Sequence, residues 1–291
     1  MSESQGSYYL PDPSHWPITG SIGLFTLFVG AATWLNGIAA GPWIMLLGFG
    51  VFVFMLFGWF GTVIRESEKG KYNSEVDISF RWGMSWFIFS EVMFFAVFFG
   101  ALFYVREYSV PWLSGHGAGF ATHSFLWSDF IADWPMQVMP DASKYSHYSE
   151  VIPAWGLPAV NTLILLTSGL TVTLAHWSMK VNNRANLCWW LFLTFALGFT
   201  FVYLQATEYH HAYHELGLKL GSGVYGSTFF MLTGFHGLHV TLGATMLVVI
   251  WVRSMKGHFT PQHHFAFEAV AWYWHFVDVV WLFLFVFVYW L

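Results

Sequence analysis

Glu91 is the residue whose chemistry most needs an explanation, because it lies within an apolar stretch of the chain. Residues 90–95 read SEVMFF, and Phe, Val and Ile dominate the flanking positions. An ionised carboxyl at the centre of a bilayer costs about 2.5–3.5 kcal/mol even on the most lenient insertion scale, and desolvation favours the uncharged acid. We therefore predict that Glu91 handles a proton or binds a polar partner. The alternative is a neutral carboxyl that hydrogen-bonds to Ser90 or to a neighbouring helix.

Two pairs of polar residues lie three positions apart within apolar segments. They are His236 with His239, and His275 with Asp278. Residues three apart share a helix face, and imidazole is a ligand for both haem and copper. However, no carboxylate or thiol completes an evident ligand set, and buried histidines also hydrogen-bond across helix interfaces. We therefore expect these four residues to serve polar packing between helices.

Further histidines cluster near the ends of apolar segments. The clusters are His210, His211 and His214 in one place, and His263 and His264 in another. Their spacing is compatible with zinc, but polar residues at a membrane interface give the same pattern. We therefore expect polar interfacial histidines, and no metal ligand, in both clusters.

The composition excludes several classes of protein. Hydrophobic residues make up 56% of the 291 positions and charged residues only 9%, whereas an ordinary soluble protein has about 25% charged residues. A nucleic-acid-binding protein would need a basic surface, but this chain has 11 Lys+Arg against 16 Asp+Glu. The single cysteine, Cys188, excludes a disulfide framework and any site that needs two thiolates.

The apolar residues form runs that are long enough to cross a membrane, since a hydrocarbon core about 30 Å thick needs roughly 20 helical residues. Tryptophan and charged residues flank the runs, and no alternation of period two extends through them, which favours helices over a β-barrel. The polar start of the chain lacks the pattern of a cleavable signal peptide, so we expect the first run to be retained. We predict an all-α polytopic membrane protein with seven transmembrane helices, at about 17–36, 43–64, 82–104, 156–177, 187–207, 227–251 and 268–290.

Basic residues are concentrated on the connections of one side. The connections after the second, fourth and sixth runs carry eight of the eleven, namely Arg65, Lys69, Lys71, Arg81, Lys180, Arg184, Arg253 and Lys256. The positive-inside rule places these connections and the N-terminus in the cytoplasm, and the C-terminus outside. The long polar connection at about 105–155 then lies outside, either as a contact site for partners or as a solvated insertion.

Arg65, Glu66 and Arg253 lie where the second and sixth runs reach the basic side. A guanidinium at that depth can bind a lipid phosphate through two hydrogen bonds. The alternative is an arginine that extends its charge to water while its stem stays in the bilayer. The residues themselves leave both interpretations open.

Several long strings in the sequence point to a family. They are YGSTFF at 225–230, TGFHGLHV at 233–240, HHF at 263–265, WYWHFVDVVW at 272–281, VIRES at 63–67 and QATEY at 205–209. On these strings, the chain resembles subunit III of the haem–copper cytochrome c oxidases over nearly its whole length. Residues 61–62, residues 71–72 and Trp177 depart from the pattern common in that family.

The resemblance implies an arrangement in which the first two helices form one bundle and the other five form another. A cleft between the bundles holds phospholipids, and the corresponding domains are residues 1–70 and 71–291. By resemblance, Glu91 is the carboxyl that reacts with carbodiimides beside this cleft. The positions that match lipid head-group contacts of the family are Trp59, Arg65, Glu66 and Arg253.

The resemblance also implies a function. The chain is expected to be an accessory subunit, without a redox centre, of an oxygen-reducing and proton-pumping oxidase of the respiratory chain. Haems and copper belong to the partners, which are the catalytic subunit I and subunit II, and cytochrome c donates electrons to the complex and not to this chain. The accessory subunit supports proton uptake and protects the catalytic subunit from inactivation during turnover. We expect a bacterial plasma membrane as its location and no nucleic-acid partner.

Three alternatives remain open. A haem- or copper-ligating membrane oxidoreductase would use His236, His239 and His275. A proton-coupled transporter would be built on Glu91, although the paired helix breaks of such folds are not evident. A purely structural scaffold would need none of these side chains for chemistry.

Overall fold

The computed structural model describes residues 9–291, and every regular element within them is helical. Seven of these helices are long and apolar enough to cross a membrane, which confirms the predicted all-α architecture with seven spans. The long helices are α1 (Trp16–Leu35), α2 (Gly41–Glu68), α3 (Ser74–Tyr104), α6 (Leu157–Lys180), α7 (Arg184–His211), α8 (Gly223–Met255) and α9 (Phe265–Leu284).

Several helices extend beyond the apolar runs of the sequence. α3 begins at Ser74 and not near residue 82, because its polar first turns are held by an ion pair of 2.7 Å between Asp77 and Arg81, one turn apart. α8 has 33 residues, which makes it about 50 Å long at 1.5 Å per residue. A hydrocarbon core about 30 Å thick therefore leaves the ends of α8 in polar surroundings.

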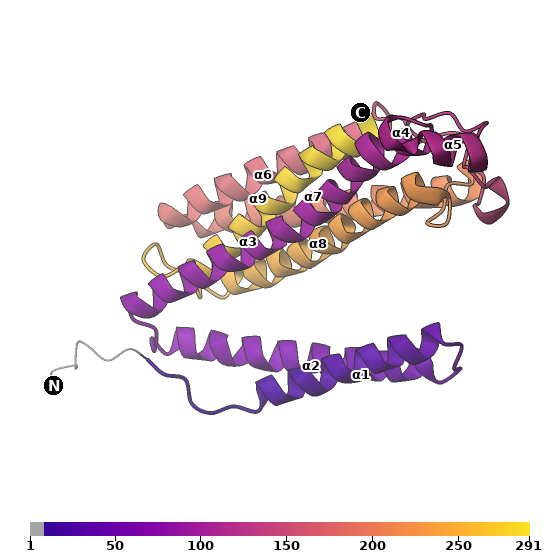
Figure 1. Cartoon of the computed structure of the whole chain (residues 1–291). Coiled ribbons are helices and arrows are strands. Elements are labelled where there is room, and N and C mark those ends of the chain that lie inside the picture. Colours follow the sequence, from indigo (N-terminus) through magenta and orange to yellow (C-terminus); the bar gives the residue numbers. More distant parts are fainter. Residues whose placement is uncertain (1–8) are drawn as a thin grey trace, which may run out of the picture. The chain divides into compact units, whose positions relative to one another are not determined.

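The chain divides into two compact units, one that ends at Arg81 and one that comprises Trp82–Leu291. The first unit contains α1 and α2. The second contains most of α3 together with α6 to α9, and Figure 1 shows these five helices side by side. The domain boundary expected after residue 70 and the lipid-filled cleft stay predictions.

The first unit is a hairpin of two helices whose backbones lie very close together. A Cβ atom added at Gly30 of α1 would lie 2.2 Å from the backbone nitrogen of Met45, and one added at Gly48 of α2 would lie 2.2 Å from that of Leu27. Small residues let membrane helices approach in this way when no hydrophobic effect drives them together. The turn between the helices contains Gly37, at a φ of +78°.

The second unit has an aromatic core in which two buried tryptophan side chains each donate a hydrogen bond to a hydroxyl group. Trp274 and Trp281 of α9 are fully buried. The Trp274 indole donates to the Ser168 hydroxyl of α6 over 2.9 Å, and the Trp281 indole donates to the Thr162 hydroxyl over 2.9 Å. These bonds satisfy the only polar atom of each ring and fix α9 against α6.

The long connection before α6 is folded against the second unit. It contains the short helices α4 (Val110–Leu113) and α5 (Phe120–Leu126). The Tyr148 hydroxyl donates to the carbonyl oxygen of Met136 over 2.7 Å, and both side chains are buried in the core. Burial, together with the charge of Asp133, raises the pKa of Tyr148 to about 12. The connection is therefore a packed part of the fold and not only a solvated insertion.

Candidate functional site

The predicted acid and one of the predicted histidines meet inside the second unit. The Oε2 atom of Glu91 on α3 lies 2.9 Å from the Nε2 atom of His239 on α8. The side chains are mostly buried, with 22% of Glu91 and 10% of His239 exposed. His239 lies on a neighbouring helix, so this contact fits both the polar partner predicted for Glu91 and the alternative of a neutral carboxyl bonded to a neighbouring helix.

The other imidazole nitrogen of His239 determines where the protons lie. Its Nδ1 atom is 2.6 Å from the carbonyl oxygen of Phe235, one helical turn earlier. A carbonyl oxygen only accepts hydrogen bonds, so Nδ1 carries a hydrogen. One further proton then lies between Nε2 and the Glu91 carboxyl, either on the acid or on the ring. Without it, a carboxylate oxygen and a ring lone pair would face each other at hydrogen-bond distance.

Aromatic rings surround this pair. The ring centres of Phe95 and His239 are 5.1 Å apart, and that of Tyr273 is 6.3 Å from His239 in a stacked arrangement. Rings supply few hydrogen-bond partners and exclude water, which strengthens the electrostatic interaction between the acid and the imidazole. The acid and the imidazole consequently form a hydrogen-bonded pair in apolar surroundings.

His236 has a different role from His239. Its Nε2 atom lies 3.2 Å from the carbonyl oxygen of Val277 on α9 and therefore donates to it. The ring is 1% exposed and lies against Trp281, with centroids 5.1 Å apart. This geometry is the polar packing between α8 and α9 that the sequence suggested.

His275 and Asp278 lie side by side on α9. The Nδ1 atom of His275 is 3.7 Å from an Asp278 carboxylate oxygen, and its Nε2 atom is 3.4 Å from the Thr173 hydroxyl of α6. Gly169 makes room for this acid, since a Cβ there would lie 2.4 Å from the same carboxylate. The two residues link α9 to α6.

The residues expected at lipid head groups are divided between the two units. In the first unit, Trp59 is exposed, and Arg65 is exposed and donates to the Thr62 hydroxyl over 3.0 Å. In the second unit, Arg253 is buried, and its guanidinium lies 4.5 Å from the centre of the Phe259 ring. Their contact with lipid stays a prediction.

Glu66 has partners within its own unit. Its two carboxylate oxygens accept hydrogen bonds from Tyr9 over 3.0 Å and from Tyr72 over 2.8 Å. Burial and the bond to Glu66 raise the pKa of the Tyr72 phenol. The carboxylate thus ties the segment before α1 to the end of α2.

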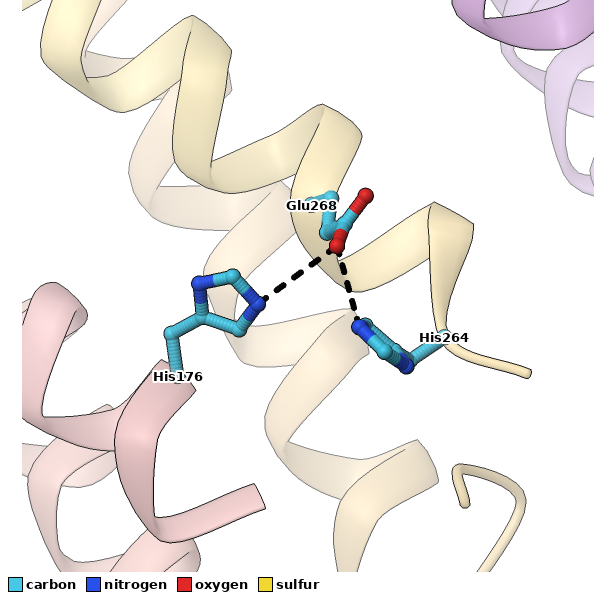
Figure 2. Close-up of side chains that lie close together, drawn as sticks. All are labelled: His176, His264 and Glu268. Atoms are coloured by element: carbon cyan, nitrogen blue, oxygen red, sulfur yellow. Dashed lines mark hydrogen bonds and ion pairs between the residues drawn. The ribbon is translucent and has the colours of Figure 1, made fainter. Parts of the chain in front are cut away.

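Sequence reasoning missed two further clusters. One is the fully buried Glu208 of α7, which accepts hydrogen bonds from Tyr289 over 2.6 Å and from Gln205 over 3.0 Å. The other joins His176 of α6 with His264 and Glu268 of α9 (Figure 2). The spacing of His264 and Glu268, one turn apart, was visible in the sequence, whereas their contact with His176 was not.

The remaining histidine cluster lies at the end of α7. The rings of His210 and His214 have centroids 4.4 Å apart, and His211 pairs with Glu215 over 2.9 Å. The side chains of His211 and Glu215 are 46% and 67% exposed. Their exposure agrees with a polar surface position.

Comparisons with known proteins bear on the whole chain. The family profile described as "Cytochrome c oxidase subunit III" matches residues 6–112 and 143–291. The curated "Cytochrome c oxidase subunit 3" of Dugong dugon is 40% identical over 291 residues, covering 100% of this chain and 99% of the relative. The proteins of the same name from Equus caballus and Felis catus are each 39% identical over 293 residues, with the same coverage.

These matches confirm the resemblance found in the sequence. They indicate a multi-pass membrane protein that works within an oxidase complex, together with other oxidase subunits. With a match across more than half of the chain and close relatives of full length, the chain belongs to the cytochrome c oxidase subunit III family.

Proposed function

We propose that the chain is a non-redox accessory subunit of a proton-pumping cytochrome c oxidase and that it binds structural phospholipids. In this proposal it also supports proton uptake by the catalytic subunit and protects that subunit from inactivation during turnover. The observation that carries this proposal is the 2.9 Å contact between Glu91 and His239. Haems and copper belong to the partner subunits I and II in this proposal, and cytochrome c donates electrons to the complex.

The geometry of His239 supports a proton role over a redox one. Both of its ring nitrogens have partners, the Phe235 carbonyl and the Glu91 carboxyl. Ligation of haem iron or copper would need one of these nitrogens and would therefore break a hydrogen bond in apolar surroundings. Holding and exchanging the proton of the pair breaks neither.

The lipid role is supported by the two arginines. A guanidinium has five N–H donors, and the bond from Arg65 to Thr62 uses one of them. The exposed Trp59 on the same helix suits the interfacial depth at which lipid head groups lie. Arg253 lies on a phenyl ring, which holds its guanidinium plane in a fixed orientation.

We further propose that the side with most Lys and Arg faces the cytoplasm, with the N-terminus there and the C-terminus outside. The relatives named above are mammalian, so the bacterial plasma membrane remains a prediction from the sequence.

The substitution Glu91→Gln in the assembled oxidase tests the proton role. A glutamine amide can donate a hydrogen bond to Nε2 of His239 but has no proton to exchange. We expect an assembled oxidase whose proton uptake is slowed several-fold at high pH and changes little at low pH, where protons are plentiful. The measurement is proton uptake by the whole complex as a function of pH.

The matched control is Glu150→Gln, which makes the same chemical change at an exposed position and should leave proton uptake unchanged. If the Glu91 variant keeps the parent pH profile with normal assembly, the chain is a scaffold and the proton role is wrong. Solute flux in liposomes that contain this chain alone would instead favour a transporter.

A further inference from the structure

We propose that His176, His264 and Glu268 form a binding site for Zn²⁺ at the junction of α6 and α9. We expected no metal ligand from the sequence, in which His176 lies far from the other two residues. Zinc has no redox chemistry, so the site is compatible with a non-redox subunit. The proposal does not depend on the lipid or proton roles proposed above.

The three donor atoms converge. Nε2 of His264 lies 3.0 Å from Oε1 of Glu268, and Nε2 of His176 lies 3.5 Å from the same oxygen. Figure 2 shows both imidazoles directed at this carboxylate, and one ligand atom of each residue lies within 4.8 Å of the others. Around a tetrahedral zinc ion with bonds of 2.0–2.1 Å, neighbouring donors are roughly 3.3 Å apart. The two distances to Oε1 of Glu268 are therefore within about 0.3 Å of those in a tetrahedral zinc site.

The hydrogen bond made by Nδ1 of His264 leaves the other ring nitrogen, Nε2, free to bind a metal ion. Its Nδ1 atom lies 3.1 Å from the carbonyl oxygen of Thr260 and therefore donates to it. The lone pair of the neutral ring is then on Nε2, which faces Glu268. Histidine ligands to metals are usually oriented by such a bond to a carbonyl oxygen. A lone pair and a carboxylate at 3.0 Å require a cation between them, either a proton or a metal ion.

The helices fix the ligands and leave an open position. His264 is the residue directly before α9, Glu268 is in the first turn of α9, and His176 is one turn before the end of α6. Side-chain exposure is 24% for His176, 10% for His264 and 13% for Glu268. An ion can therefore reach the site from the polar end of the helices, and water can supply the fourth ligand.

The donor set selects the class of metal. Two imidazole nitrogens and one carboxylate oxygen suit Zn²⁺ and similar transition metals, whereas Mg²⁺ and Ca²⁺ prefer an all-oxygen shell. We therefore expect Zn²⁺ to bind in the presence of a large excess of Mg²⁺.

The test uses the purified whole oxidase, treated with a chelator and then titrated with Zn²⁺ against a zinc-sensitive dye in excess Mg²⁺. The parent complex should bind one equivalent of zinc more than each of the variants His176→Gln, His264→Gln and Glu268→Gln. The control is His263→Gln, which changes an exposed neighbouring imidazole and should keep that equivalent. Haem content verifies that every variant has assembled.

A second measurement keeps the proposal testable if a variant fails to assemble. X-ray absorption at the zinc edge of the parent complex, at one added equivalent, should show nitrogen and oxygen donors at about 2.0–2.1 Å with scattering from two imidazole rings. Equal zinc binding by the parent and all assembled ligand variants would overturn the proposal, and so would a bound zinc without imidazole scattering.

Discussion

At the scale of single residues, the two large indoles buried in the second unit, Trp274 and Trp281, each have a specific hydrogen-bond partner. Trp274 illustrates the principle, because it is 0% exposed and its only polar atom donates to the Ser168 hydroxyl. The ring also fits against Gly198, where a Cβ would lie 2.6 Å from it. A large aromatic residue is thereby accepted in the centre of a membrane bundle without an unsatisfied donor.

The bond between Trp274 and Ser168 makes a testable prediction. Ser168→Ala removes the acceptor and leaves a buried indole N–H without a partner, which we expect to destabilise the complex by about 1–2 kcal/mol. The measurement is the thermal denaturation midpoint of the purified oxidase. Thr167→Val, which removes an exposed hydroxyl at the adjacent position, should leave the midpoint within error. An equal shift for both variants would show that the indole bond is not the cause.

The residue scale also shows where sequence reasoning ends. The pattern of apolar runs predicted that Glu91 needs a polar partner, since hydrocarbon penalises a lone carboxyl wherever it lies. It could not identify His239, because the two residues are 148 positions apart and helical periodicity relates only near neighbours. For the same reason, the contact of His176 with His264 and Glu268 could not be predicted from the sequence.

At the scale of helices, glycine decides how α1 and α2 pack. Both Gly30 and Gly48 face backbone atoms of the opposite helix, where a methyl group has no room. Gly50 lies on the same helix as Gly48, yet a Cβ there meets nothing within 4 Å. Substitutions at these two glycines of one helix can therefore distinguish the effect of close helix packing from the effect of helix propensity.

Accordingly, Gly48→Ala and Gly50→Ala should act in opposite directions. Gly48→Ala forces the helices apart and should raise the rate at which a protease cuts the turn between α1 and α2 by several-fold. Gly50→Ala replaces a flexible residue inside a helix and should be neutral or stabilising, by about 0.5–1 kcal/mol. The measurement is limited proteolysis of the purified complex. Equal cutting rates for both variants would contradict close packing as the reason for Gly48.

Helices were the part of the fold most open to prediction. All seven were predicted because a bilayer requires long apolar segments. Their ends were less predictable, since the first turns of α3 are polar and depend on the pair between Asp77 and Arg81. The packing of the connection before α6, where Tyr148 bonds to Met136, left no periodic signal in the sequence.

At the scale of the whole molecule, the distribution of basic residues predicts how the chain crosses the membrane. Cys188 is the only cysteine, so Cys188→Ser provides a background without thiols. In that background, Lys256→Cys should react with a membrane-impermeant maleimide only from the cytoplasmic side, and Lys144→Cys only from outside. The measurement is labelling of intact cells against inverted vesicles. The reverse pattern would show that the positive-inside rule fails for this chain.

The bond between Glu91 and His239 makes one hydrogen responsible for a contact between two helices. While this hydrogen is present, it attracts α3 to α8 at that height of the bundle. Without it, a carboxylate oxygen and a ring lone pair would face each other at 2.9 Å, and their repulsion would loosen the contact. Under the proposed proton role, the strength of this one link between two helices would therefore depend on whether the pair holds its hydrogen. An amide at position 91 cannot release its hydrogen, so in that variant the link would stay in place.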